Sequence, residues 1–415
     1  MKAEIIAVGT ELLLGQIVNT NAQTLSVKLA ELGIDVYFQS VVGDNPGRLR
    51  EAIEIGRKRA DLLVFTGGLG PTQDDLTKEV LAQYLNRSLI IHEPSMDKIK
   101  ALFSERGTHM VESNRKQAIM LEASEPLHNN AGLAVGVGVV QDGTAYLLLP
   151  GPPRELKAML ASSADQWLRQ QIGNVKPLYS RILKFAGIGE SNLEDQLLDL
   201  IEQQQETTLA PYAKEGEVAL RVSVKAESEA IAEQKINAAV IQIKERVGHH
   251  LYAEQDIPIE VTIHQLLRSS RRTLASAESC TGGLFAELIT SVPGSSGEFK
   301  GGVVTYTNEM KHQLLGIPLS MLEGDGAAGA VSEQTARLMA DNMRQIANTD
   351  FAVSFTGVAG PGTAEGKPVG LVYIALAQRE KDTAVYELKL GGDREMIRLR
   401  AVKAAQYRLW QALTQ

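Results

Sequence analysis

Apolar and polar residues follow two different periods along this chain. Short runs of consecutive apolar, often β-branched residues, such as positions 2–8, are followed by segments with an apolar residue at every third or fourth position, such as 21–32. The first pattern is typical of buried strands and the second of amphipathic helices. The alternation falls into three blocks, which predict domains over residues 1–172, 177–256 and 257–415.

The first block predicts an α/β domain with a parallel sheet, because strands alternate with helices in units that require crossover connections. Asn19 or Thr20 caps the first helix, and Gly33 follows its end. The expected strands cover residues 2–8, 35–42 and 61–66, the expected helices cover 21–32, 46–59 and 75–85, and apolar segments near 132–140 and 144–149 extend the sheet before a last helix that ends near 171.

The second block predicts a small α+β domain that links its neighbours or assists assembly, since no motif in it carries chemistry. Its expected elements are strands at 181–186, 207–212, 217–226 and 249–253 and helices at 191–204 and 228–247. The third block alternates again and predicts a second α/β domain. Its expected elements are helices at 258–269, 283–291, 309–315, 332–347 and 394–412 and strands at 273–277, 302–307, 350–356, 369–377 and 383–390.

The composition is that of an ordinary globular protein with several domains. At about 150 residues per domain, 415 residues predict two or three. The 42 basic and 50 acidic side chains give a net charge of −8. The electrostatic field of the whole chain would repel the phosphates of a nucleic acid, which argues against binding that relies on this field. The lone cysteine, Cys280, excludes an internal disulfide and a multi-thiolate metal site. No apolar run has the roughly 18 uncharged residues of a membrane span, and the first residues resemble a strand rather than a signal peptide, so a cytoplasmic location without membrane contact is expected.

Glycine and polar residues gather at the ends of the predicted strands in the first block. The fullest example is residues 66–75, TGGLGPTQDD, and shorter ones are 9–11, GTE, and 43–45, GDN. Ligands of a parallel sheet collect at these carboxyl ends, and glycine amides before a helix favour phosphate. Asp74 and Asp75 would repel phosphate unless a divalent cation such as Mg²⁺ bridges them. The segment therefore predicts a metal-assisted site for a phosphorylated ligand, the alternative being a plain turn with an aspartate that caps the next helix.

Other nucleotide and metal signatures are absent from the sequence. No G-x-G-x-x-G or G-x-x-x-x-G-K-[S/T] motif occurs, and residues 362–368 miss the second one by their spacing and by Pro368. The seven histidines have no ligand spacing, so a histidine metal site is not expected.

The third block contains AESCTGG, residues 277–283, in which Ser279 follows an apolar strand and two glycines open a helix. Amides of the helix start would stabilise an oxyanion beside this serine. A nucleophilic hydroxyl needs a base, and no histidine occupies a comparable strand end. Lys311, in the first turn after the next strand, is the candidate base because burial lowers the pKa of an amine, and Tyr306 would relay the proton. The rival nucleophile, Cys280, is expected to be buried and inert.

Two further glycine-rich segments of this block point to ligand binding. Residues 355–362, FTGVAGPG, place Thr356 and glycine amides at a strand end, and residues 391–395, GGDRE, place Arg394 at a helix start, where it suits a phosphate. Each segment alone is explained as well by a turn or a solvated charge. Together with AESCTGG they indicate one binding site.

Long motifs of this chain resemble the CinA family along essentially its whole length. Those similar to the nicotinamide-nucleotide amidase domain of that family are AESCTGG, residues 291–311, FTGVAGPG, residues 367–375 and GDRE. Those similar to its amino-terminal domain, which itself resembles molybdopterin-binding folds, are residues 8–21, 41–46, 66–79, 148–155 and 187–191.

The resemblance implies two activities in one chain that forms homodimers through its linking domain. The carboxyl-terminal domain would hydrolyse nicotinamide mononucleotide to nicotinic acid mononucleotide and ammonia without a cofactor, and the amino-terminal domain would be a divalent-metal-dependent ADP-ribose pyrophosphatase. The amidase would use Ser279, Lys311 and Tyr306 as catalytic residues and would bind its substrate through Thr281, Gly282, Gly283, Thr356, Gly357 and Arg394. The pyrophosphatase would bind its substrate through Thr10, Glu11, Asn19, Asp44, Gly67, Gly68, Gly70, Thr72, Pro150 and Gly151 and its metal through Asp74 and Asp75.

Two segments depart from the family pattern. Residues 324–334, GDGAAGAVSEQ, hold an apparent insertion without the expected histidine, near the predicted amidase site. Residues 127–136, LHNNAGLAVG, lack the usual prolines and have Leu133 in place of a threonine, which would weaken the first activity if this loop closes over the pyrophosphate. The alternative to catalysis is a competence- or damage-related protein that binds nucleotides without turnover, with an inactive or molybdopterin-binding amino-terminal domain.

Overall fold

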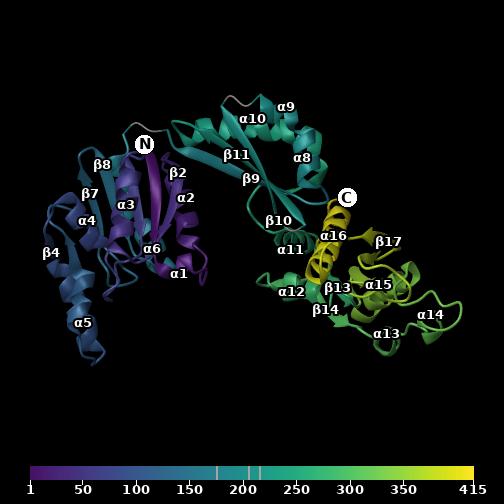
Figure 1. The fold of residues 1–415 in the computed structure, drawn as a ribbon. Coiled ribbons are helices and arrows are strands. Elements are labelled where there is room, and N and C mark those ends of the chain that lie inside the picture. The colour runs from purple at the N-terminus through teal and green to yellow at the C-terminus, as the bar shows by residue number, and fades with distance from the viewer. Residues whose placement is uncertain (174–175, 204–205, 215) are drawn as a thin grey trace. The chain divides into compact units, whose positions relative to one another are not determined.

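Three α/β or α+β domains follow one another in the computed structural model of this chain, which describes residues 1–173, 176–203, 206–214 and 216–415. Contacts divide the described chain into two units, Met1–Tyr179 with Lys225–Ala232 and Ser180–Val224 with Glu233–Gln415. The amino-terminal domain lies in the first unit. The carboxyl-terminal domain lies in the second unit, together with most of the linking domain (Figure 1).

The amino-terminal domain is a three-layer α/β structure. In chain order its elements are β1 (Lys2–Val8), α1 (Thr10–Leu13), α2 (Thr20–Glu31), β2 (Asp35–Val42), α3 (Pro46–Arg57), β3 (Leu62–Thr66), α4 (Thr77–Leu85), β4 (Leu89–Ile91), α5 (Glu93–Glu105), a 3₁₀ helix (Glu112–Ala118), β5 (Ile119–Leu121), β6 (Glu125–Leu127), β7 (Gly136–Gln141), β8 (Thr144–Leu149), α6 (Pro153–Leu160) and α7 (Ser163–Gln171). The main sheet has the order β2-β1-β3-β8-β7-β6, in which the first four strands are parallel and β7 runs antiparallel to both of its neighbours, β8 and β6. Successive residues of β1 face opposite sides, so Ile5 packs in the core under α2, α6 and α7 and Ile6 in the core under α3 and α4.

The linking domain packs helices against a four-stranded sheet. In chain order its elements are β9 (Leu178–Phe185), α8 (Glu190–Gln196), α9 (Leu198–Glu202), β10 (Thr207–Lys214), β11 (Glu217–Lys225), α10 (Glu229–Val247), a 3₁₀ helix (Gly248–His250) and β12 (Leu251–Ala253). The strand order is β10-β11-β9-β12. The expected α+β domain is therefore confirmed.

The carboxyl-terminal domain is again three-layered. In chain order its elements are α11 (Ile259–Ser270), β13 (Leu274–Glu278), α12 (Leu284–Thr290), a 3₁₀ helix (Ser295–Gly297), β14 (Phe299–Val304), α13 (Asn308–Leu315), α14 (Leu319–Leu322), α15 (Glu333–Ala347), β15 (Phe351–Gly357), β16 (Leu371–Gln378), β17 (Lys381–Lys389) and α16 (Arg394–Thr414). The sheet has the order β14-β13-β15-β16-β17, in which the first three strands are parallel and β16 runs antiparallel to both of its neighbours, β15 and β17. Helices α11, α12 and α16 cover one face, and α13 and α15 cover the other.

Within the second unit, the linking and carboxyl-terminal domains share one hydrophobic core. Ala186 and Tyr252 of the linking domain belong to the same buried cluster as the apolar residues of α11 and α16. Gly187 has a φ of +71°, and a Cβ at this position would lie 2.2 Å from Cε1 of Tyr407 on α16. Only glycine allows this approach, so the backbone of the linking domain at Gly187 packs directly against the Tyr407 ring of the carboxyl-terminal domain.

The structure differs from the predicted elements in a few places, each for a local reason. The helix expected over 75–85 begins at Thr77, and neither Asp74 nor Asp75 caps it, since its N-cap is Leu76. The strand expected to continue to 307 ends at Val304. The helix expected over 191–204 is interrupted at Leu197, and position 204 lies outside the described residues. The sequence did not predict the small sheet of β4 and β5, because strands of three residues show no period.

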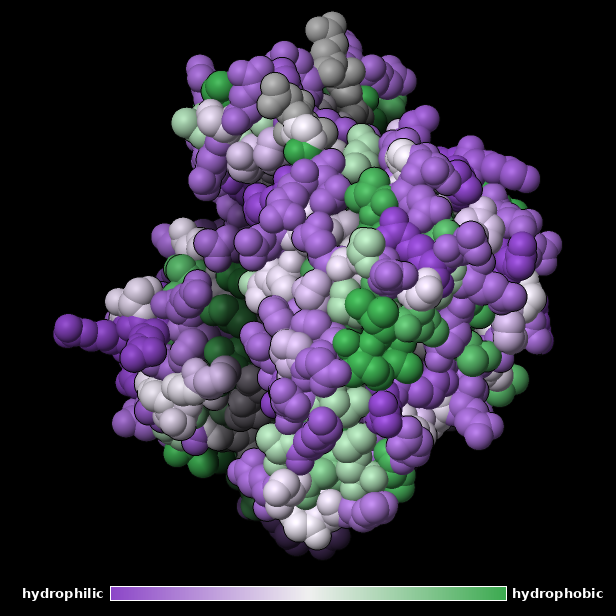
Figure 2. All heavy atoms as spheres, turned by 90° about the vertical axis from the view of Figure 1, so that its left-hand side faces the viewer, coloured by the Kyte–Doolittle hydropathy of each residue, from purple (hydrophilic) through white to green (hydrophobic). Residues whose placement is uncertain are grey.

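The surface of the chain is mostly polar on the face that Figure 2 shows, with apolar side chains gathered in patches between the polar ones. Among the residues that the structure describes, no helix is long and apolar enough to cross a membrane. The burial of apolar residues is concentrated in the cores of the sheets.

Candidate functional site

The carboxyl ends of three strands in the carboxyl-terminal domain form a pocket of about 220 Å³. Because β14, β13 and β15 are parallel neighbours, the residues that follow them meet at one edge of the sheet. Ser279 follows β13, Tyr306 follows β14, and Thr356 lies at the end of β15. The pocket is lined by Ser279, Cys280, Tyr306, Thr307, Asn308, Lys311, Ala330, Val331, Thr356, Gly357, Ala359, Glu365 and Arg394.

Ser279 and Lys311, predicted as nucleophile and base, are in direct contact and form a hydroxyl–amine pair. Lys311 Nζ lies 3.0 Å from Ser279 Oγ and donates to the Thr305 carbonyl at 2.9 Å. Thr307 caps α13 and places Lys311 in its first turn, where the side chain is only 2% exposed. Burial lowers the pKa of Lys311 below its ordinary value. The pair therefore has the geometry for transfer of a proton from the hydroxyl to a neutral amine.

Arg394 begins α16 and reaches two groups at the pocket. Its Nη1 donates to the Gly360 carbonyl at 2.6 Å, and its Nη2 donates to the Tyr306 hydroxyl at 2.7 Å. Tyr306, the expected proton relay, thus binds Arg394, and the described contacts include no hydrogen bond from it to the hydroxyl–amine pair. Thr356 Oγ1 donates to the Ala330 carbonyl at 2.5 Å and so supports a pocket wall.

The expected oxyanion site at the start of α12 is taken by a side chain of the protein itself. The Glu278 carboxylate accepts hydrogen bonds from three amides of this helix start, the first of them that of Gly283, at 2.9, 3.1 and 2.9 Å. It satisfies amides that have no partner within the helix and complements the positive end of the helix dipole. These amides are therefore unavailable to a substrate. Thr281, Gly282 and Gly283, predicted to bind substrate, are not among the described lining residues, and Thr281 is fully buried.

The segment at 324–334, predicted to hold an insertion, contributes part of the pocket wall. Its residues Ala330 and Val331 line the pocket, and their amides donate to the Glu365 carboxylate at 3.0 and 3.2 Å. Glu365 and Asn308 also line the pocket and were not predicted from the sequence. Both lie in polar segments, where a charged or amide side chain is normally solvated and gives no signal of a site.

Cys280, the rival nucleophile, is buried beside Ser279. Burial raises the pKa of its thiol to about 12, so the thiol is protonated at neutral pH. A protonated thiol is a poor nucleophile, in agreement with the expectation of an inert cysteine.

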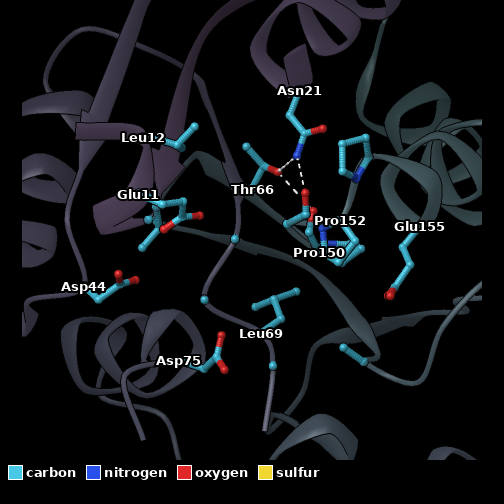
Figure 3. A pocket seen from close by; sticks show the side chains of 18 of the residues that line it. Glu11, Leu12, Asn21, Asp44, Thr66, Leu69, Asp75, Pro150, Pro152 and Glu155 are labelled. Carbon is cyan, nitrogen blue, oxygen red and sulfur yellow. Dashed lines mark hydrogen bonds between the residues drawn. The ribbon is translucent and has the colours of Figure 1, made fainter. Parts of the chain in front are cut away.

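The parallel strands of the amino-terminal domain end at a larger pocket, of about 570 Å³ (Figure 3). Five carboxylates and the glycine-rich loop after β3 line it. Gly67 has a φ of +105°, and a Cβ there would lie 2.1 Å from the Val8 carbonyl oxygen, so the loop needs glycine at this point. The lining residues are Val8, Gly9, Glu11, Leu12, Ile17, Val18, Asn19, Thr20, Asn21, Asp44, Thr66, Gly67, Gly68, Leu69, Gly70, Pro71, Thr72, Asp74, Asp75, Gln117, Ala134, Pro150, Gly151, Pro152, Pro153 and Glu155.

All but one of the residues predicted to bind the phosphorylated substrate or its metal are in this lining set. The exception, Thr10, holds Asp44 instead, because its amide and its hydroxyl both donate to Asp44 Oδ2 at 2.8 Å. Thr72 holds Asp75 in the same way, with its amide at 2.9 Å and its hydroxyl at 2.5 Å from Oδ2. In the described part of the chain, the second oxygen of each aspartate has no hydrogen-bond partner.

Asn21, in the first turn of α2, connects two walls of the pocket and was not predicted. Its Nδ2 donates to Thr66 Oγ1 at 2.9 Å and to the Gly151 carbonyl at 2.6 Å (Figure 3). Its Oδ1 is buried and has no partner among the described atoms. In the sequence, the only indication of this role is that a polar residue stands among the apolar positions of the helix, close to Ala22 and Leu25.

The loop at 127–136, which the resemblance led us to expect to be altered, forms part of the pocket surroundings. The Asn129 side chain accepts from two amides of the loop at 3.1 and 2.8 Å and donates to Glu155 at 2.6 Å. Leu133 packs on the small apolar cluster of α5, and Ala134 is the loop residue that lines the pocket.

The donors in this pocket suit a hard cation such as Mg²⁺, because they are carboxylate oxygens. Within the described residues, no three His, Cys, Asp or Glu side chains form a group that could hold a metal ion by themselves. Mg²⁺ is typically held by one or two carboxylates and completed by phosphate and water. Asp74 and Asp75, the predicted metal ligands, would hold a cation in that way only together with a phosphorylated ligand and water.

Three family models match consecutive parts of the chain. Residues 4–170 match "Probable molybdopterin binding domain", residues 180–253 match "Damage-inducible protein CinA KH domain", and residues 256–413 match "CinA C-terminal domain". KH domains clamp a nucleic-acid backbone with a G-x-x-G loop. Residues 180–253 of the sequence contain no G-x-x-G.

Full-length relatives have closely similar sequences. One from Geobacillus sp. (strain WCH70), whose name describes a competence-damage inducible protein, is 49% identical over 97% of this chain and 96% of its own length. One of the same name from Bacillus cereus (strain AH187) is 46% identical over 100% of this chain and 99% of its own. Among solved structures, CinA of unknown function from Thermoplasma acidophilum is 32% identical with a TM-score of 0.37, covering 40% of this chain and 97% of its own. A competence/damage inducible protein from Agrobacterium tumefaciens is 39% identical with a TM-score of 0.36, covering 38% of this chain and 94% of its own.

Proposed function

Because the chain belongs to the CinA family, we propose that its carboxyl-terminal domain is a nicotinamide-nucleotide amidase, which hydrolyses nicotinamide mononucleotide to nicotinic acid mononucleotide and ammonia. The observation that carries this proposal is the 3.0 Å contact between Ser279 Oγ and Lys311 Nζ at a pocket. A lysine can accept a proton only while it is neutral, and burial favours the neutral form.

In the proposed reaction, neutral Lys311 accepts the Ser279 hydroxyl proton while Oγ forms a bond to the carboxamide carbon. The C–N bond of the tetrahedral intermediate then breaks, and Lys311 returns the proton to the nitrogen, which leaves as ammonia. A water molecule attacks the resulting ester and gives a proton to Lys311. The bond to Ser279 breaks, and that proton returns to Oγ. One water is consumed and one ammonia is released.

Arg394 is the proposed anchor of the substrate phosphate. Its guanidinium has five N–H donors, of which two are used by Gly360 and Tyr306, and it stands at the start of α16. In this interpretation Tyr306 supports Arg394 and does not carry the proton.

Removal of either member of the hydroxyl–amine pair tests the proposal. Ser279→Ala and Lys311→Ala should each lower ammonia release from nicotinamide mononucleotide by about 10³-fold or more, because the nucleophile or its base is lost. Cys280→Ala is the matched control and should retain the wild-type rate. Circular dichroism checks that the variants are folded. Full activity of either pair variant would refute the assignment.

We further propose that the amino-terminal domain is a divalent-metal-dependent ADP-ribose pyrophosphatase. The specific support is that carboxylates and a glycine-rich loop share one pocket there. Asp74 and Asp75 would hold the cation together with phosphate and water. Bound there, it would offset the charge of the pyrophosphate and activate water. The buried, unpartnered Asn21 Oδ1 would accept a hydrogen bond from the ligand.

A further inference from the structure

Arg398 lies one helical turn after Arg394 on α16, so both guanidinium groups extend from the same side of this helix. It is not among the described lining residues of the pocket. Instead its Nε and Nη2 donate to the Thr281 carbonyl at 3.1 and 2.7 Å. Hydrogen bonds from a charged donor are about twice as strong as neutral ones. Arg398 therefore binds the backbone of the turn that carries Ser279 through two hydrogen bonds.

This turn has an unusual backbone and is tied down at both ends. Gly282 and Gly283 have successive φ angles of +61° and +94°, in the left-handed region. At the start, the Ser279 amide donates to the Phe355 carbonyl at 3.0 Å, and at the end Gly283 is bound by the capping carboxylate at 2.9 Å. Between these anchors, the guanidinium is the charged group that holds the carbonyl of Thr281.

The helix that carries Arg398 is itself held in place. Lys403, farther along α16, donates to Glu217 at 2.7 Å and to Glu260 at 3.1 Å, and all three side chains are nearly buried. Removing one partner of such a buried ion pair is costly, so these contacts tie α16 to β11, which carries Glu217, and to α11, which carries Glu260. Arg398 is thus a fixed support for the turn.

We propose that Arg398 is a positioning residue of the hydrolase: it fixes the Thr281 carbonyl and thereby keeps Ser279 Oγ within reach of Lys311 Nζ. This inference rests on the proposed role of Ser279 as nucleophile. Arginine suits the task because two N–H groups of its planar fork meet one carbonyl oxygen, which a lysine ammonium cannot reproduce with the same geometry. A displacement of about 1 Å at a reacting group can cost about 10²-fold in rate.

The test compares Arg398→Lys and Arg398→Met with Arg408→Lys in the full chain. Arg408 is the matched control, because it lies on the same helix but contacts the ring of Tyr386. Two rates are measured: ammonia release from nicotinamide mononucleotide, and sulfonylation of Ser279 by phenylmethylsulfonyl fluoride, followed by mass spectrometry. In the second reaction Oγ bonds to sulfur, fluoride leaves, and the hydroxyl proton passes to Lys311.

Both Arg398 variants should lower kcat and the labelling rate by about 10- to 100-fold, with KM and the melting temperature little changed, whereas Arg408→Lys should match wild type. Wild-type labelling in the Arg398 variants, or a loss confined to KM or to thermal stability, would overturn the proposal. If Arg398→Met does not fold, Arg398→Lys decides.

The labelling assay separates this proposal from the proposed function. If the wild-type chain is labelled at Ser279 but releases no ammonia, the amidase proposal fails and the comparison of labelling rates still tests Arg398. If Ser279 of the wild-type chain is not labelled, it is not an activated nucleophile, and the proposal for Arg398 fails with it.

Discussion

Burial decides the protonation state of two neighbouring side chains in the pocket of the carboxyl-terminal domain. Burial lowers the pKa of Lys311 and raises the pKa of Cys280 to about 12, so it favours the neutral form of both. A neutral amine can accept a proton, whereas a neutral thiol is a weak nucleophile. The same physical cause therefore supports Lys311 as a base and argues against Cys280 as the attacking group.

The pH dependence of ammonia release should show this effect at Lys311. Because only the neutral amine accepts the Ser279 proton, kcat/KM should rise with pH and level off once Lys311 is deprotonated. Burial places its pKa below the ordinary lysine value of about 10.4, so the midpoint should lie below that value. Initial rates across the neutral and alkaline range check this. Lys311→Arg, which stays charged, should be inactive throughout. A midpoint at or above the ordinary value would contradict a buried base.

At the scale of elements, the junction between β13 and α12 depends on one carboxylate. Glu278 is 1% exposed and accepts from three amides of the helix start. Without it these donors would be buried and unpaired. The motif at this strand end therefore has two parts, a glutamate that builds the helix start and a serine that faces the pocket.

Glu278→Ala should lower the free energy of unfolding of the carboxyl-terminal domain by about 2 kcal/mol, since a helix cap is lost and amides are left unsatisfied. Glu287→Ala is the matched control, because Glu287 is an exposed residue of the same helix, and its effect should stay within about 0.5 kcal/mol. Calorimetry of the full chain measures both. Equal effects of the two substitutions would show that the cap does not stabilise the helix.

At the scale of the whole molecule, two pockets of different chemistry lie in the two units. One is lined by five carboxylates and a glycine-rich loop, and the other holds a buried hydroxyl–amine pair. The first would need a cation to accept a phosphorylated ligand, and the proposed steps at the second need only protein groups and water. The two proposed activities should therefore respond differently to metal removal.

Chelation with EDTA should stop the hydrolysis of ADP-ribose and leave ammonia release from nicotinamide mononucleotide unchanged. Added Mg²⁺ in excess of the chelator should restore the first activity, which serves as the control for damage by EDTA. Assays of both products from one preparation make the comparison. Survival of both activities would show that Asp74 and Asp75 do not bind a required metal.

Much of this protein could be predicted from its sequence, because strand-end positions follow from topology. Once β13 and β14 are known to be parallel neighbours, the residues after them must meet, and this placed Ser279 near Lys311 although the two lie 32 positions apart in the chain. The same rule gathered Asp44 and Asp75 at the edge of the first sheet. Period, glycine placement and strand order were sufficient for these conclusions.

Tertiary structure alone decided which polar group each side chain binds. Glu278 accepts hydrogen bonds from the amides that were expected to stabilise an oxyanion. The Tyr306 hydroxyl accepts from Arg394, and Thr10, expected to bind the ligand, donates to Asp44 instead. Asn21 binds Thr66 and Gly151 at the pocket, although the hydrophobic pattern of its helix predicted only a packing role for the helix. These hydrogen bonds join segments that are remote in sequence, and each forms or breaks when its atoms move by about one ångström. The spacing of hydrophobic residues along the chain does not contain that information. The sequence therefore determined where the sites lie, and the packed structure determined which atoms form them.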